Sequence, residues 1–127
     1  RLDPRLAAQV RWPVHPGKNF VATGGFGPDI VTPDELPKGA APLRIMTRVN
    51  GVTMQDSSTD DLIFDVPTLV HELTKVMTLD PGDIIITGTP SGVAMARKPQ
   101  NWLKPGDVCE VEIEKIGVLR NPIAQGG

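Results

Sequence analysis

Polar and apolar side chains alternate along residues 43–49 (LRIMTRV), which are followed by Asn50-Gly51 and by VTMQDS. A period of two predicts a β-strand with one face toward a core and the other toward solvent. Asn-Gly is the favoured pair for a two-residue hairpin of type I′, because both residues tolerate positive φ. The pattern therefore predicts a β-hairpin that turns at Asn50-Gly51. The residues expected on its apolar face are Leu43, Ile45, Thr47 and Val49.

The hydrophobic spacing changes to a helical period after residue 65. Apolar residues then recur at i, i+3, i+4 and i+7, which is typical of one face of an α-helix. These residues are Val66, Leu69, Val70, Leu73, Val76 and Met77. Asp65 is expected to cap this helix, and Pro67 is tolerated in the first turn, where a missing N–H costs nothing. The pattern predicts one main helix, with His71 on its solvent side.

The second half of the chain contains a Pro-Gly turn twice, as LDPGD at residues 79–83 and as LKPGD at residues 103–107. Pro-Gly suits a type II turn, and each turn is expected to start a strand. The first strand is the isoleucine run of GDIIITG; the second is DVCEVEIEK, which returns after Gly117 into VLRN. A further short strand is expected at residues 29–31. Together these elements predict a β-rich α+β fold with one main helix, in a single domain of residues 1–127.

Composition limits the classes of partner. A chain of 127 residues with 39% apolar and 22% charged residues fits one soluble globular domain. A net charge of −2, with two Trp, three Phe and no Tyr, argues against a nucleic-acid partner. No apolar run reaches the roughly 18 residues of a membrane span and no signal peptide opens the chain, so we expect no membrane partner and a cytoplasmic location. The single Cys109 excludes an internal disulfide and is expected to be a buried, inert thiol.

Familiar metal and nucleotide patterns are missing from the sequence. His15 and His71 do not pair on one element, although His15, between two prolines, can line a pocket. Glu110, Glu112 and Glu114 alternate with apolar residues and are expected on a solvated strand face. The stretch GTPSG lacks the Lys-Ser/Thr of a phosphate loop and the Gly-x-Ser-x-Gly order of a nucleophile elbow.

Two loops remain as candidate binding elements. In GKNF (residues 17–20), Lys18 can hold an anionic oxygen as a point charge. In TGTP (residues 87–90), hydroxyls and backbone N–H groups at a strand end can orient a carboxylate, with Gly88 and Thr89 as the central residues. The alternatives are an ordinary surface lysine and an ordinary turn, and spacing alone leaves them open.

Five motifs occur in an order that resembles the fumarylacetoacetate hydrolase family. They are GKNF (residues 17–20), GPDIVTPDELP (27–37), VNG with QDSST (49–59), PGDI through TGTPSGV (81–93), and LKPGDV through GVLRN (103–121). They extend over nearly the whole chain from Gly17 to Asn121. Each motif alone is weakly specific, but the five together in this order are highly specific.

The resemblance implies a β-roll of mixed strands and a homodimeric enzyme that uses Mg²⁺ or Mn²⁺ on a 2-keto or 2,4-diketo acid. Hydrolysis of a C–C bond in an acylpyruvate is the expected reaction; isomerisation, hydration and decarboxylation are the family alternatives. By resemblance, Lys18 is the catalytic and substrate-binding lysine, and Thr89, with Gly88 beside it, contacts the substrate carboxylate.

The sequence departs from the family at the metal. In the family a Glu-x-Glu pair and a later Asp hold the metal, and all three precede the Gly-Lys motif. The chain starts at Arg1, and only Asp3 lies near that point, so no residue of this chain is assigned as a metal ligand. The domain is therefore expected to be incomplete at its N-terminal side. A metal-free dimerisation or binding module of the same fold is the alternative to an enzyme.

Overall fold

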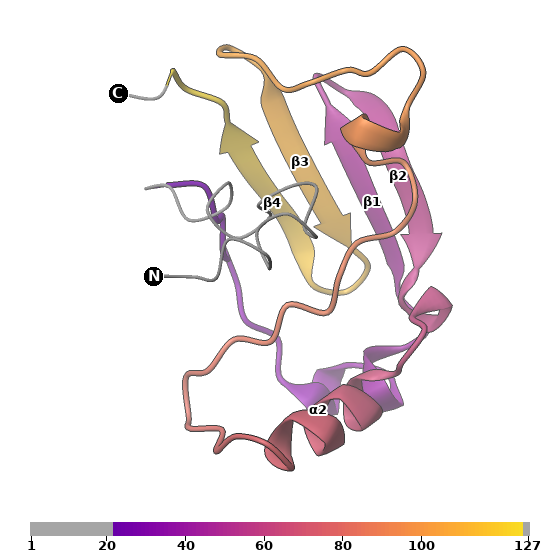
Figure 1. Ribbon diagram of the computed structural model, residues 1–127, viewed down its shortest axis with the longest axis vertical. Coiled ribbons are helices and arrows are strands. Elements are labelled where there is room, and N and C mark those ends of the chain that lie inside the picture. The colour runs from indigo at the N-terminus through magenta and orange to yellow at the C-terminus, as the bar shows by residue number, and fades with distance from the viewer. Residues whose placement is uncertain (1–21, 126–127) are drawn as a thin grey trace, which may run out of the picture.

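A four-stranded sheet organises the computed structural model, which describes residues 22–125 (Figure 1). The strand order is β2-β1-β3-β4, and all three pairings are antiparallel. The strands are β1 (Arg44–Val49), β2 (Val52–Ser58), β3 (Val108–Ile113) and β4 (Gly117–Pro122). The α-helix is α2 (Val66–Thr74), and the 3₁₀ turns are η2 (Pro33–Glu35), η3 (Lys38–Ala40), η4 (Thr59–Asp61) and η5 (Ala94–Ala96). The predicted β-rich class with one main helix is confirmed, although no parallel pair of a mixed sheet occurs among the described strands.

The predicted hairpin is confirmed. Asn50 and Gly51 have φ values of 51° and 80°, as a type I′ turn requires. Asn50 also joins the hairpin to β3: its Nδ2 donates to Asp107 Oδ1 at 2.8 Å, and its Oδ1 accepts from the Val108 N–H at 2.9 Å. The turn residue therefore holds the two halves of the sheet together.

Replacing Asn50 by alanine should lower the free energy of unfolding by about 2 kcal/mol. The variant loses two hydrogen bonds, and alanine has no polar side chain to stabilise the positive φ at this position. Asn50→Gly is the matched control, since glycine loses the same hydrogen bonds but accepts the backbone conformation. Urea unfolding of both variants should show the larger loss for alanine. Equal losses would rule out a backbone contribution.

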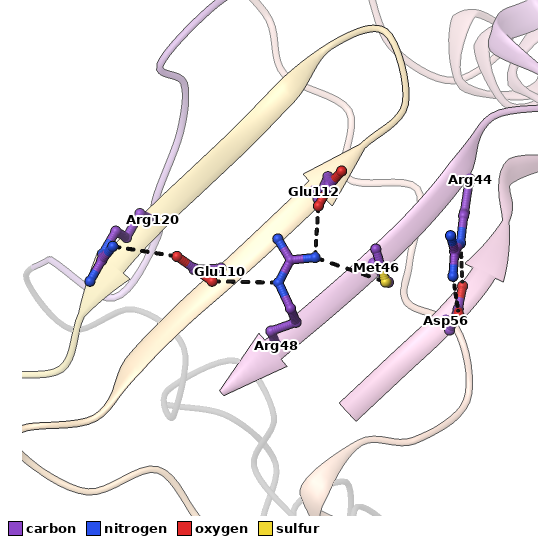
Figure 2. Close-up of polar contacts among 7 residues, drawn as sticks. All are labelled: Arg44, Met46, Arg48, Asp56, Glu110, Glu112 and Arg120. Atoms are coloured by element: carbon purple, nitrogen blue, oxygen red, sulfur yellow. Dashed lines mark hydrogen bonds and ion pairs between the residues drawn. The ribbon is translucent and has the colours of Figure 1, made fainter. Parts of the chain in front are cut away.

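The face of the sheet drawn in Figure 2 is charged. Arg48 lies between two strand-β3 carboxylates, 2.7 Å from Glu112 and 3.5 Å from Glu110, and Arg120 on β4 reaches Glu110 from the other side (Figure 2). These hydrogen bonds to carboxylates, that to Glu112 first, raise the pKa of Arg48. Two of the three glutamates expected on a solvated face, Glu110 and Glu112, therefore belong to a cross-strand network of ion pairs. A separate bidentate pair joins Arg44 to Asp56.

The opposite face carries the apolar side chains of the alternating pattern. In the described part of the chain, Leu43 is the only fully buried residue, at 1% exposure. Thr59 fixes it in place: the Leu43 N–H donates to Thr59 Oγ1 at 2.9 Å, and that hydroxyl donates to the Ala40 carbonyl at 2.6 Å. Many other apolar side chains stay exposed, Ile63 at 91% among them.

Helix α2 begins as predicted and ends earlier. Asp65 accepts a hydrogen bond from the Thr68 N–H at 2.8 Å, which confirms the cap, and Pro67 lies in the first turn. The helix ends at Thr74, so Val76 and Met77 lie beyond it, although their N–H groups still bond to the Leu73 carbonyl. His71 is exposed, as predicted.

Two predicted strands are absent. Residues 29–31 and 82–86 have no regular structure, and Ile84 and Ile86 are 62% and 89% exposed. A strand needs a neighbour for its backbone N–H and C=O groups, and no described segment pairs with either stretch. Their apolar character therefore predicts strands that the described segments do not form.

Both Pro-Gly turns are confirmed. The Asp83 N–H bonds to the Asp80 carbonyl and the Asp107 N–H to the Lys104 carbonyl, each at 3.0 Å, with φ of 105° at Gly82 and 93° at the second glycine. Only the second turn leads into a strand, β3.

Within residues 22–125 no helix is long and apolar enough to cross a membrane.

Candidate functional site

A hollow of about 540 Å³ lies where the apolar face of the sheet meets the loop of residues 87–92. One wall consists of loop residues. The other comes from the end of β2, from η4, from the segment that precedes α2 and from α2 itself. The lining residues are Ile45, Ser57, Ser58, Thr59, Asp61, Leu62, Ile63, Phe64, Leu69, Thr87, Gly88, Thr89, Pro90 and Ser91. Hydroxyl groups therefore face an apolar floor, an arrangement suited to a small ligand with one polar end.

Gln55 on β2 anchors the loop. Its Nε2 donates to Thr89 Oγ1 at 3.0 Å, to the Pro90 carbonyl at 2.8 Å and, at a longer 3.3 Å, to the Ser91 carbonyl. Gln55 lies opposite Thr47 in the β1–β2 register, so its side chain belongs to the apolar face of the sheet. One side chain thus fixes three successive residues of the loop.

Arg97 and Gly92 hold the end of the same loop. Arg97 Nε donates to the Gly92 carbonyl at 2.8 Å, and its Nη2 donates to the Met54 carbonyl. Met54 has this carbonyl available because the β1–β2 register shifts there, between Thr47 and Arg48. Gly92 has φ of 100°, and a Cβ at this position would lie 2.5 Å from the Met54 oxygen. The loop packs against the bulged strand through backbone that only glycine allows.

The tip of the loop is open. Gly88 has φ of 110°, and a Cβ built on it would meet nothing within 4 Å. Thr89 is exposed, apart from the hydrogen bond that its hydroxyl accepts from Gln55. The predicted substrate-binding residues, Gly88 and Thr89, therefore lie side by side on the wall of the hollow.

The opposite wall carries Asp61. The Ser57 hydroxyl donates to its carboxylate, and the Ser58 N–H lies 3.4 Å from the same oxygen. These hydrogen bonds, that of Ser57 first, lower the pKa of Asp61, so the group is ionised at neutral pH. Among the described residues around the hollow, Asp61 is the only ionisable one. An anionic ligand here therefore needs a cation from elsewhere.

The described residues do not supply a metal site. No group of three His, Cys, Asp or Glu side chains gathers anywhere within residues 22–125. Nothing in this part of the chain therefore fits the divalent metal that the resemblance implies. Lys18, His15 and Asp3 lie outside the described residues.

Cys109 lies away from this hollow. It lines a second one of about 230 Å³, together with Arg97 and Trp102. The thiol is half-buried and not fully buried as predicted, and burial raises its pKa, which favours the unreactive thiol form. Gln55 and Ser57 received no role from the sequence, although both belong to the QDSST motif. Alternation counted from the Asn50-Gly51 turn places both on the charged face, and the bulge in β2 turns them to the apolar face.

Comparison with known proteins identifies the chain's relatives. Residues 3–124 match the family model described as fumarylacetoacetate (FAA) hydrolase, C-terminal. A protein of Archaeoglobus fulgidus is 52% identical over 104 residues, which cover 82% of this chain and 37% of the relative. The chain thus spans little more than a third of the length of that curated relative.

Two solved structures are similar in fold and sequence. Fumarylacetoacetate hydrolase from psychrophilic Exiguobacterium antarcticum has a TM-score of 0.76 and 44% identity over 80% of this chain and 36% of its own. Maleylpyruvate hydrolase from Sphingobium sp. SYK-6, in complex with manganese(II) and pyruvate, has a TM-score of 0.70 and 36% identity over 80% and 35%. Both similarities extend over 80% of this chain, which confirms the predicted fold.

Proposed function

Because this chain belongs to the fumarylacetoacetate hydrolase family, we propose that the intact protein is a divalent-metal-dependent enzyme that hydrolyses a C–C bond in an acylpyruvate. The observation that carries the proposal is the hollow beside residues 87–92. Its loop wall is neutral and rich in hydroxyls, and Gln55 and Arg97 hold that wall in place. Such a wall suits the carboxylate end of a keto acid, because it orients the group without adding charge.

The chain's own residues have defined tasks in this proposal. Thr89 donates a hydrogen bond to the substrate carboxylate, and the open backbone at Gly88 lets that carboxylate approach. Lys18 supplies positive charge that the described wall lacks. Water adds across the C–C bond, so the acylpyruvate gives pyruvate and a second carboxylic acid. The metal, Mg²⁺ or Mn²⁺, would be held by residues outside the described part of the chain.

Turnover by the intact protein tests the proposal. Acetylpyruvate, the simplest acylpyruvate, should be consumed with release of pyruvate in the presence of Mg²⁺ or Mn²⁺, and a chelator should stop the reaction. Consumption without pyruvate would replace hydrolysis by isomerisation or hydration. No turnover of any 2-keto or 2,4-diketo acid, with either metal, would leave the binding-module alternative in its place.

A homodimer and a cytoplasmic location complete the proposal. Exposed apolar side chains such as Ile63 and Phe64, at 91% and 61% exposure, favour burial of this surface in a larger assembly. Sedimentation velocity of the intact protein should give the mass of two chains, and a monomer would contradict this part.

A further inference from the structure

Gln55 has an unusual set of acceptors. Its amide nitrogen has two hydrogens and lies within hydrogen-bond distance of three oxygens, two of them backbone carbonyls and one the Thr89 hydroxyl. The carbonyl contacts position the loop. The contact with the hydroxyl has a different effect. A hydroxyl can either donate or accept a hydrogen bond, and the Gln55 amide determines which of the two the Thr89 hydroxyl does here.

The Thr89 hydroxyl accepts from Gln55, so its own hydrogen must point elsewhere. A threonine hydroxyl has one hydrogen and two lone pairs, and an amide nitrogen only donates. Within the described part of the chain, Thr89 Oγ1 has no acceptor for its hydrogen. Thr89 lines the hollow, so the hydrogen is left for an acceptor bound there.

We propose that Gln55 is a positioning residue that sets Thr89 as a hydrogen-bond donor toward the carboxylate of a bound 2-keto acid. This inference rests on the proposed function, since it concerns the same hollow. The neutral amide also matters: Asp61 already places one negative charge on the opposite wall. A carboxylate at position 55 would add a second, and would take the Thr89 hydrogen for itself.

Binding of pyruvate to the intact protein with Mg²⁺ present, measured by calorimetry, tests the inference. Gln55→Met keeps the size of the side chain and removes the donor, and should weaken pyruvate about tenfold, as expected for a hydrogen bond to a charged group. Gln55→Glu should weaken it further, by about a hundredfold, because it adds like charge and diverts the Thr89 hydrogen. In turnover, KM should rise while kcat changes little, since the carboxylate contact is the same in ground and transition states.

Gln100→Met is the matched control. Gln100 is exposed and donates to the Met95 carbonyl at 3.0 Å, away from the hollow. This variant removes the same chemical group and should leave pyruvate affinity unchanged. Melting temperatures of all variants show that each is folded, and Thr89→Ser, which keeps the hydroxyl, should bind pyruvate like the wild type.

A double-mutant cycle with Thr89→Val separates the hydroxyl from the loop backbone. If Gln55 acts through Thr89, Gln55→Met should weaken binding much less in the Thr89→Val background than in the wild type. Equal effects in both backgrounds would overturn the inference, as would unchanged pyruvate binding in folded Gln55→Met and Gln55→Glu. Failure of the wild type to bind pyruvate would instead overturn the proposed function.

Discussion

Replacing Gly92 by alanine is expected to lower the free energy of unfolding by about 3 kcal/mol, the sum of a backbone strain and an overpacking cost. The strain arises because φ at Gly92 is 100°, which L residues with a Cβ rarely adopt. The overpacking arises because the new Cβ would lie 2.5 Å from the Met54 carbonyl oxygen and 3.2 Å from Gln55 Cγ. Backbone cannot move aside as a flexible side chain can, so the loop must leave the bulged strand.

Gly82→Ala is the matched control for this variant. Gly82 has nearly the same φ, 105°, but a Cβ there would meet nothing within 4 Å. It should lose only the strain, about 1–2 kcal/mol. Urea unfolding of both variants gives the difference, which measures the contact with Met54. Equal losses would show that the loop does not pack on β2 as described. A displaced loop should also weaken pyruvate binding, because Gln55 and Thr89 then separate.

Local signals predicted the parts of the fold that depend on local chemistry. The Asn50-Gly51 turn, the Asp65 cap and the two Pro-Gly turns each rely on a backbone conformation that one or two residue types favour. Neighbours along the chain decide these features, and the structure confirms all of them.

Features that depend on distant partners were not predictable. The isoleucine run at residues 82–86 has the composition of a buried strand, but composition does not reveal whether a pairing strand is present. Likewise, the bulge in β2 turns Gln55 to the apolar face of the sheet, and only the fold brings loop 87–92, more than thirty residues away, to its amide. Gly88 and Thr89 were predicted from the family resemblance, and the hollow beside them came from the structure.

Lys18→Met is expected to lower kcat/KM for an acylpyruvate by about a hundredfold or more, the usual cost of removing one preorganised stabilising group. The reason is the charge of the hollow. Its described lining contains one ionised group, Asp61, which is negative. Arg97, which anchors the end of the loop, donates to the carbonyls of Met54 and Gly92 and is not among the lining residues. A keto acid brings its own negative charge, and in the proposed site Lys18 and the metal offset both charges.

Two further variants make this expectation specific to position 18. Lys38→Met removes an exposed lysine of η3 and should leave kcat/KM unchanged, so it controls for net charge. Lys18→Arg keeps the charge but replaces a compact ammonium by a planar fork, and should recover only part of the loss. If the activity depends on Lys18 through charge, the defect of Lys18→Met should also be larger with an anionic substrate than with its methyl ester. Full activity of Lys18→Met would remove Lys18 from the site, and the positive charge that the hollow requires would then have to come from the metal alone.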